Sequence, residues 1–397
     1  MSKQKFNVVL LDKQNHHQFQ PLFYQVATAG LEPSSIAFPF RKIFQNFRNI
    51  DIRLTEVTKI NASVNILETS IGIVHYDHLV IATGCKTNFF GNKEITKNAL
   101  SMKTTQEAIN IRNSVLLNFE NILSASEEEK EALLNIVIVG GGPTGVELSG
   151  AFAEMKKNIL PKDYPTIDFS KLTIMLVEGS KNTLNSMNDV SKQASRRYLE
   201  QLGVIIKTET IVTTYDGTTI TFNNGKQIKS KNVIWAAGVI GNVIEGVESE
   251  SINRNRYIVD RYNKIKNYNN IYAIGDIAYM ETPKYPNGHP QLANVAINQG
   301  KVLAQNFINK LKGKTLIEYE YKDLGAMATI GKNKAVVELP FIKFQGRLAW
   351  YVWMFLHLML ILGVRNKLII FINWAWSYFT NDSSLRLILK TKDHSTK

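Results

Sequence analysis

The sequence predicts an α/β protein with two parallel-sheet domains in tandem, one inserted into the other, followed by a helical C-terminal region. Two units share one order of elements: an apolar strand ending in an acid, a β-rich stretch, and an apolar strand ending in glycine. A glycine-rich turn at residues 140–145 joins another strand to an apolar helix. A repeat of this kind is typical of two doubly wound domains in one chain. One large α/β domain with chance similarity is the alternative.

The first unit runs from a strand that ends at Asp12 to a strand that ends at Gly84. The second runs from a strand that ends at Glu178 to a strand that ends at Gly238, and a further strand ends at Gly275, directly before Asp276. The expected boundaries give a first domain in two parts (residues 1–110 and 251–330), an inserted domain (111–250) and a C-terminal region (331–397).

Charge and composition narrow the class of partner. The chain has 397 residues with 44% hydrophobic and 20% charged residues, which excludes a mainly disordered protein. The formal net charge of +13 favours anionic partners. Residues 341–397 hold eight of the bases and only two acids, Asp382 and Asp393, in a stretch rich in Trp, Leu and Ile. This combination favours an anionic lipid surface over nucleic acid.

A single cysteine, Cys85, excludes a disulfide framework, a cysteine zinc site and an internal redox pair. His16 and His17 have no further ligand at metal-binding spacing, so no metal site is expected. The first residues lack an apolar signal core, which favours a cytoplasmic setting.

Residues 140–145 carry the clearest chemical motif, Gly140-x-Gly142-x-x-Gly145 between a strand and a helix. The first glycine permits the tight turn, the second lets the backbone approach a pyrophosphate, and the third lets the helix pack on the strand. The helix N-terminus then faces the negative charge of the ligand. A purely structural glycine turn is the alternative.

Acidic residues at strand ends predict ribose recognition in both Rossmann-like domains. Glu178 closes the strand after the glycine motif, where a carboxylate accepts hydrogen bonds from the ribose hydroxyls and repels a 2′-phosphate. NADH is therefore favoured over NADPH, although Lys181 lies nearby. Asp12 holds the matching place in the first domain, but no glycine loop precedes it. We expect the first strand, loop and helix of that domain to be missing.

Taken together, these features resemble the type II NADH:quinone oxidoreductases, which are single-subunit enzymes that do not pump protons. The resemblance covers residues 6 to about 389. That family has an FAD domain, an inserted NADH domain and a C-terminal membrane-anchoring part. Its specific marks here are residues 19–28, Ala82-Thr83-Gly84, residues 140–147, Ala236-Ala237-Gly238, Gly275-Asp276 and residues 327–331.

The resemblance implies roles for single residues. Asp12 would bind the FAD ribose, and Asp276 would bind the ribitol–phosphate region of FAD. Glu147 would lie near the nicotinamide–flavin contact, where a carboxylate positions the nicotinamide amide or relays a proton. An acid favoured by the helix dipole is the alternative for Glu147. The remaining residues assigned to cofactor binding are Gln20, Thr28, Thr83, Gly84, Gly238 and Gly275.

Asn294 and Asn298 are four residues apart on a helix that is expected to begin near Pro290, so they share a face. The family pattern has glutamine at both places, lining the quinone pocket. Asparagine keeps the hydrogen-bonding group but shortens its reach by about 1.5 Å, one carbon–carbon bond. This departure puts quinone turnover in question.

Two apolar runs in the C-terminal region, residues 348–364 and 368–379, predict interfacial helices with tryptophan at headgroup depth. This would make the protein a peripheral one on the cytoplasmic face of the cell membrane. One short transmembrane helix at residues 348–364, or a hydrophobic homodimer interface, are the alternatives.

The favoured function is FAD-dependent transfer of a hydride from NADH and of two electrons on to a membrane quinone. A degenerate or truncated paralogue that binds NADH and membrane but lacks flavin is the second hypothesis, because the glycine loop is missing and both glutamines are replaced. A flavoprotein with a soluble protein acceptor is the third, and the hydrophobic C-terminal region argues against it.

Overall fold

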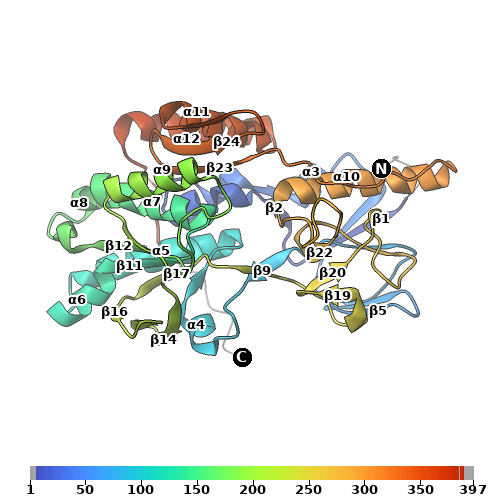
Figure 1. Cartoon of the computed structure of the whole chain (residues 1–397), viewed down its shortest axis with the longest axis horizontal. Coiled ribbons are helices and arrows are strands. Elements are labelled where there is room, and N and C mark those ends of the chain that lie inside the picture. Colours follow the sequence, from blue (N-terminus) through green and yellow to red (C-terminus); the bar gives the residue numbers. More distant parts are fainter. Residues whose placement is uncertain (1–5, 384, 389–397) are drawn as a thin grey trace. The chain divides into compact units, whose positions relative to one another are not determined.

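The computed structural model describes residues 6–383 and 385–388, so residues 1–5 and 389–397 at the ends of two predicted domains lie outside the described residues. The chain forms two compact units (Figure 1). Unit 1 takes the described parts of Met1–His17, Phe38–Lys86 and Val239–Asp323, and unit 2 takes those of Gln18–Ala37, Thr87–Gly238 and Leu324–Lys397. The predicted boundaries near residues 110, 250 and 330 concern cofactor domains and stay predictions.

Unit 2 is built on a parallel five-stranded sheet. The strands run in the order β10 (Leu100–Ser101), β17 (Asn232–Trp235), β11 (Asn135–Val139), β12 (Thr173–Val177) and β13 (Ile205–Lys207). All five residues of β11 are buried, as expected for a run of Ile and Val between two other strands. The predicted inserted Rossmann-like fold is therefore confirmed.

Two long helices of unit 2 begin at complete capping boxes. Thr104 and Ser126 each form a complete capping box, with Glu107 and Glu129 respectively. The longer helices are α5 (Thr105–Ile122), α6 (Glu127–Leu134), α7 (Pro143–Asn158) and α9 (Asp189–Gln201). The shorter ones are η1 (Gln20–Leu22), α1 (Phe23–Ala27), α2 (Pro33–Ile36), α4 (Lys93–Asn98), α8 (Leu160–Asp163) and η2 (Phe169–Lys171). An antiparallel sheet adds β14 (Val212–Tyr215), β15 (Thr219–Phe222) and β16 (Gln227–Lys229).

The C-terminal region adds an antiparallel sheet and two helices to unit 2. The sheet contains β23 (Ala326–Gly331), β24 (Lys334–Glu338) and β25 (Lys343–Gln345), and the helices are α11 (Arg347–Leu360) and α12 (Val364–Thr380). Helix α7 packs on β23 so closely that a Cβ on Gly150 would lie 1.7 Å from the carbonyl oxygen of Ile330.

The alternative of one short transmembrane helix at residues 348–364 finds no support in the structure. Within the described residues, no helix has the length and apolar character needed to cross a bilayer. Helix α11 has 14 residues, which span about 21 Å at 1.5 Å per residue, against about 30 Å for the hydrocarbon core. It ends at Leu360 because Ile361 turns to an extended conformation and Gly363 takes a positive φ of 78°.

Unit 1 contains two parallel strand pairs and two antiparallel sheets. Strand β1 (Val8–Asp12) pairs with β4 (Ile50–Leu54), and β8 (Leu79–Ile81) pairs with β21 (Ile271–Ala273). In the described part of the chain, no hydrogen-bonded strand joins the first pair to the second. The first antiparallel sheet contains β5 (Val57–Asn61), β6 (Ile66–Thr69) and β7 (Gly72–His75). In the second, β19 (Ile252–Asn253) pairs antiparallel with β20 (Arg256–Ile258), and β22 (Ala278–Tyr279) pairs with β20 in parallel.

Helix α10 (Ala293–Leu311) is the long helix of unit 1, and α3 (Phe40–Ile43), η3 (Ser249–Ser251) and η4 (Gly275–Ile277) are short. The core of this unit gathers Ile60 from β5, Leu67 from β6, Tyr257 from β20 and Ile271 from β21. Short strands lie where the chain passes from one unit to the other: β2 (His16–Gln18), β3 (Ala37–Pro39), β9 (Cys85–Thr87) and β18 (Val239–Gly241).

Candidate functional site

The predicted dinucleotide turn has the geometry of a phosphate-binding loop. Gly140 has a φ of 113°, and a Cβ on it would lie 2.7 Å from the backbone of Ala236. A Cβ on Gly145 would lie 1.8 Å from the carbonyl oxygen of Gly140, whereas nothing lies within 4 Å of a Cβ on Gly142. No side chain caps α7 at Gly142. Open space therefore lies beside an uncapped helix N-terminus, which fits a pyrophosphate.

Glu178 directly follows β12 and is fixed against this loop. Its Oε2 accepts a hydrogen bond from the amide of Gly141 at 2.5 Å, and its Oε1 accepts from the amide and the hydroxyl of Ser180 at 2.7 and 2.5 Å. These bonds hold the carboxylate beside the turn, where a ribose acceptor is needed in a Rossmann-like domain. The residues present therefore fit an NADH site.

Four residues assigned to FAD leave two neighbouring strands of unit 1 at the same end. Ile81 of β8 lies opposite Ala273 of β21 in a parallel register, so Thr83 and Gly84 follow one strand where Gly275 and Asp276 follow the other. Gly84 and Gly275 have φ values of 64° and 75°. Polar groups that converge at the carboxyl ends of parallel strands are typical of a nucleotide site.

Side chains around Asp276 fix the same place. The Cys85 thiol donates to Asp276 Oδ2 at 3.0 Å, and Gln291 Nε2 donates to the Asp276 carbonyl at 3.0 Å. The Gly275 amide donates to Gln299 Oε1 at 2.7 Å. A backbone turn tied to two side chains of the α10 segment keeps this acid at a defined position, as a cofactor ligand requires.

Asp12 ends β1 in the other strand pair of unit 1. Its Oδ1 accepts a hydrogen bond from the amide of Gln14 at 2.7 Å. Burial raises the pKa of Asp12, and the Gln14 bond opposes this only in part. The strand pair β1–β4 shares no ladder bonds with β8–β21 in the described residues, so the structure does not bring Asp12 and Asp276 into one sheet.

Asn294 and Asn298 lie in the first two turns of α10 and bond to each other. Asn298 Nδ2 donates to Asn294 Oδ1 at 2.7 Å and to the Asn294 carbonyl at 3.0 Å. Asn294 Nδ2 and Asn298 Oδ1 stay outside this mutual bond. The same end of α10 touches the Gly275 turn, since a Cβ on Gly275 would lie 3.1 Å from the Ala296 Cβ. The start of α10 therefore lies beside the Gly275–Asp276 turn.

Gln20 and Thr28 belong to unit 2 and not to the unit that holds Asp12 and Asp276. Gln20 begins the 3-10 helix η1. Thr28 is buried at the C-terminal end of α1, where its hydroxyl donates to the Tyr24 carbonyl at 2.9 Å. Gly238 ends the strand segment after β17 with a φ of 70°, and a Cβ on it would lie 2.9 Å from the ring of Phe90.

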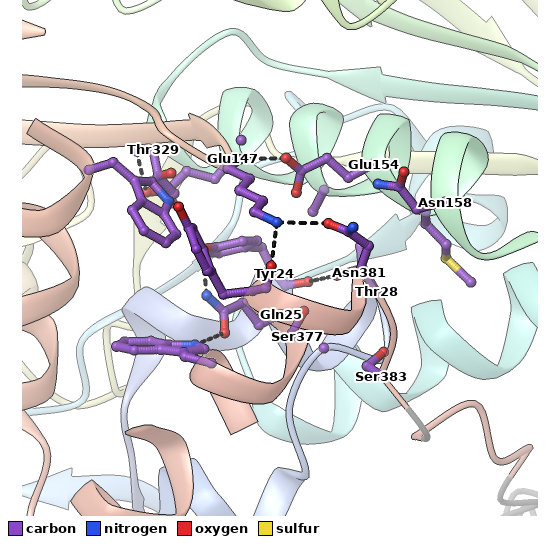
Figure 2. Close-up of a pocket in the computed structure, with 18 of the residues that line it drawn as sticks. Tyr24, Gln25, Thr28, Glu147, Glu154, Asn158, Thr329, Ser377, Asn381 and Ser383 are labelled. Atoms are coloured by element: carbon purple, nitrogen blue, oxygen red, sulfur yellow. Dashed lines mark hydrogen bonds between the residues drawn. The ribbon is translucent and has the colours of Figure 1, made fainter. Parts of the chain in front are cut away.

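Thr28 also lines a cavity of about 170 Å³ within unit 2 (Figure 2). The walls come from α1, α7, β23, α11, α12 and the segment after α12. The lining includes Tyr24, Thr28, Glu147, Glu154, Asn158, Lys332, Trp353, Trp374, Ser377, Tyr378 and Asn381. Aromatic rings and two acids therefore line one cavity.

Glu147 faces this cavity. Its side chain is partly exposed and lines the cavity wall. Burial raises the pKa of Glu147 to about 8, although the amide of Thr329, 3.4 Å from Oε1, favours the charged form. The Trp353 indole also favours the charged carboxylate, without forming a hydrogen bond of normal geometry. A carboxyl group with this pKa is mainly protonated at pH 7, so it can donate a hydrogen bond or a proton.

Glu154 is a second acid on the same wall, and the sequence analysis missed it. Its Oε1 accepts a hydrogen bond from the amide of Lys332, and burial raises its pKa. Tyr24 accepts a hydrogen bond from Gln25 at 2.7 Å, and burial raises the pKa of its hydroxyl well above the usual value. The spacing of seven between Glu147 and Glu154 was the available signal, because residues two helical turns apart share a face.

Within the described residues, no group of three or more histidine, cysteine, aspartate or glutamate side chains is placed to hold a metal ion. His16 and His17 of β2 belong to no such group.

Comparisons with known proteins agree with this geometry. Residues 1–300 match the pyridine nucleotide-disulphide oxidoreductase family, and residues 324–381 match the NDH2 C-terminal domain. A type II NADH:quinone oxidoreductase of Mycobacterium tuberculosis is 31% identical over 94% of this chain and 83% of that protein. A probable NADH dehydrogenase of Dictyostelium discoideum is 28% identical over 93% of this chain and 84% of that protein.

Solved structures support the fold. NDH2 of Plasmodium falciparum in complex with NADH superposes with a TM-score of 0.89 and 21% identity, covering 98% of this chain and 96% of that one. The sulfide:quinone oxidoreductase of Aquifex aeolicus gives a TM-score of 0.71 and 18% identity, covering 91% and 86%. At these identities the likeness concerns the fold alone.

Proposed function

Because the chain belongs to the type II NADH:quinone oxidoreductases, we propose that it passes a hydride from NADH to FAD and two electrons on to a membrane quinone, without pumping protons. The observation that carries the proposal is the loop at Gly140–Gly145 with Glu178 fixed against it, in a chain that matches this family along most of its length. This combination joins a nicotinamide nucleotide site to a family whose named members reduce quinones.

The loop and Glu178 would bind NADH. The pyrophosphate would lie in the open space beside Gly142, against the uncapped first turn of α7. Glu178 would accept the hydrogen bonds of the adenosine ribose hydroxyls while the amides of Gly141 and Ser180 hold its carboxylate in place. A negative side chain there disfavours a 2′-phosphate, so NADH is the preferred donor.

The polar cluster of unit 1 would hold FAD, which supplies the chemistry of accepting a hydride and releasing electrons when it is bound. Asp276 would bind the ribitol–phosphate region, supported by the bonds from Cys85 and Gln291. Thr83, Gly84 and Gly275 would let the cofactor approach the backbone closely, and Asp12 would bind the ribose. Gln20, Thr28 and Gly238 complete the proposed set of flavin and nicotinamide neighbours.

Glu147 would act next to the nicotinamide. As a mainly protonated acid at pH 7, it can donate a hydrogen bond to the carboxamide of the nicotinamide or release a proton. Glu147 lies in the second turn of α7, two residues after Gly145, on the helix that the pyrophosphate loop begins. Binding of the dinucleotide and placement of the acid thus depend on one element.

Asn294 and Asn298 would bind the quinone ring. Their mutual bond leaves Asn294 Nδ2 as a donor and Asn298 Oδ1 as an acceptor, so the pair can donate to a quinone carbonyl or accept from a quinol hydroxyl. The bond also fixes both side chains, which lowers the entropy lost when a ligand binds. Asparagine at both places therefore retains the hydrogen-bonding function.

Helices α11 and α12 would hold the protein on the cytoplasmic face of the membrane as a peripheral protein. Apolar side chains of both helices are exposed; among them are Leu348, Phe355, Leu360, Leu368, Phe371, Ile372, Trp376 and Phe379. Arg347, Arg365 and Lys367 at the starts of these helices would bind anionic headgroups. Burial of the same side chains in a homodimer is the competing arrangement, and vesicle flotation of the monomer distinguishes the two.

An absorption spectrum of the purified protein, recorded before and after addition of NADH and then of a quinone, tests the proposal. Bound flavin that loses its visible absorption with NADH and regains it with quinone is the expected result. A colourless protein that still binds NADH would contradict the proposal and support the degenerate paralogue. If NADH reduces the flavin but quinone does not reoxidise it, NADH would stand as the electron donor and quinone would be excluded as the acceptor.

A further inference from the structure

We propose that the cavity of unit 2 conducts the solvent proton consumed in quinone reduction, with Glu154 as the relay residue between bulk water and Glu147. The inference rests on the proposed function, because it assumes that Glu147 lies beside the reacting groups. It adds a proton route and a relay residue that the sequence motifs and the proposed function do not identify. Its basis is the arrangement of two acids, a water-sized space and a polar mouth along one helix (Figure 2).

The proposed reaction needs such a route. NADH gives up one hydrogen with both electrons, whereas a quinone takes up two electrons and two protons to become a quinol. The balance is NADH + H⁺ + quinone giving NAD⁺ + quinol, so one proton per turnover comes from solvent. Active sites that transfer hydride exclude water, because bulk water would interfere with the reaction. The proton must therefore travel through the protein.

The two acids lie at a spacing that water can bridge. Glu147 and Glu154 are seven residues apart on α7, so they share a face and lie about 10 Å apart along the helix axis. This is too far for a direct hydrogen bond. A cavity of about 170 Å³ has room for several waters, since one water occupies about 30 Å³ of liquid volume. The hydroxyls of Tyr24, Thr28 and Ser377 line the same space and can order these waters.

The far end of the cavity is polar and reaches the surface. Asn158 lies four residues after Glu154 on the same face of α7, and the exposed Asn381 faces it from the segment after α12. Lys332 Nζ donates to Asn381 Oδ1 at 2.8 Å and to the carbonyl of Tyr378. Glu154 therefore lies between a solvent-facing mouth and the inner acid, which is the position of a relay.

Charges around Glu154 suit the direction of transfer. The groups facing it are Glu147 and Lys157 on α7, Lys332 and Lys334 on the β23–β24 hairpin, Tyr24 on α1 and Tyr378 on α12. Three lysines favour the charged form of Glu154, while no cation is among the causes that set the pKa of Glu147. Burial raises the pKa of Glu154 on balance, but the lysines limit this rise, so Glu154 can take a proton at the mouth and release it inward, whereas Glu147 holds a proton at pH 7. Protons would thus move inward.

Hydrogen exchange of the inner acid tests the relay without any turnover. The carboxylic C=O band of Glu147 in the infrared spectrum, assigned by its loss in Glu147→Gln, shifts when the protein is mixed with D2O. We expect Glu154→Gln to slow this shift by about 10- to 100-fold. The glutamine oxygen still accepts the Lys332 amide, so the fold should be kept. Glu154→Asp should restore most of the rate, and Glu131→Gln, an exposed acid on α6, should change nothing.

Rapid mixing of the flavin-loaded protein gives the second test. Glu154→Gln should leave flavin reduction by NADH unchanged and slow reoxidation by quinone about 10-fold or more. Added acetic acid, a small proton donor, should raise the slowed reoxidation rate of this variant. Unchanged exchange of Glu147 together with unchanged reoxidation in Glu154→Gln would overturn the relay. Failure of NADH to reduce the flavin of the unmodified protein would instead overturn the proposed function, whatever the exchange experiment shows.

Discussion

The buried carboxyl group of Glu147 makes the stability of unit 2 depend on pH. Its pKa is about 8 in the folded protein against an ordinary 4.5. Between these values the folded state keeps a proton that the unfolded chain releases, so the free energy of unfolding falls as pH rises. The contribution is complete below about pH 4.5, declines with rising pH and is lost above about pH 8. At about 1.4 kcal/mol per pH unit, the difference amounts to about 5 kcal/mol at most.

Water in the cavity screens the ionised group, so we expect about 2–5 kcal/mol. Urea unfolding of the protein and of Glu147→Gln, followed by tryptophan fluorescence at several pH values between about 5 and 8, measures it. Trp353 and Trp374 line the cavity and report on this unit. Because the other titrating groups are common to both proteins, the difference between the two unfolding free energies isolates Glu147. A difference that does not change with pH would refute the assignment of this pKa to burial.

Three further predictions concern packing, NADH and the membrane. Gly150→Ala should lower the free energy of unfolding in urea by about 3 kcal/mol or more, because its Cβ would meet the Ile330 carbonyl at 1.7 Å. The control is Gly179→Ala, whose Cβ has only an ordinary contact at 3.6 Å and which should change stability by less than about 1 kcal/mol. Glu178→Ala should raise the KM for NADH about 5- to 150-fold with little change in kcat, as loss of one or two hydrogen bonds to a charged group implies; an unchanged KM would remove Glu178 from the site. Trp376→Ser should weaken flotation with anionic vesicles about 10-fold or more, because the indole is 64% exposed and free to enter lipid. Equal flotation of the two proteins would show that Trp376 does not enter the lipid.

Local patterns predicted the fold of the glycine turn and of the strands beside it. The glycine turn and the strand of Ile and Val before it are short-range features, and the structure gives Gly140, Gly142 and Gly145 the geometries that the motif requires. Glu178 follows its strand directly, so its place beside the turn depended only on the adjacency of β11 and β12. The same holds for Thr83 and Asp276, which end paired strands.

The cavity was beyond sequence reasoning because its walls come from six segments that are spread widely along the sequence. Thr28 was assigned to the flavin by resemblance, and the structure shows its side chain beside Tyr24 in unit 2. Glu154 carried no motif, and its neighbour Lys332 is 178 residues away. The apolar runs predicted two C-terminal helices, and the structure separates α11 from α12 at Ile361–Gly363.

Residues 18–37 have a consequence for synthesis of the chain. They lie between segments of unit 1 but complete unit 2, where Asn366 Nδ2 bonds to the carbonyl of Ser34 across 332 residues and Trp374 Nε1 bonds to Gln25 Oε1 across 349. At about 5–20 residues per second, a ribosome needs roughly 20–70 s to reach the later partners. During that interval Tyr24 lacks its ring contact with Trp353 of α11, and Gln25 lacks its hydrogen bond from Trp374 of α12. Helix α1 can therefore pack on α5 and α7 early in synthesis, whereas its bonds to the C-terminal helices form only when translation nears its end.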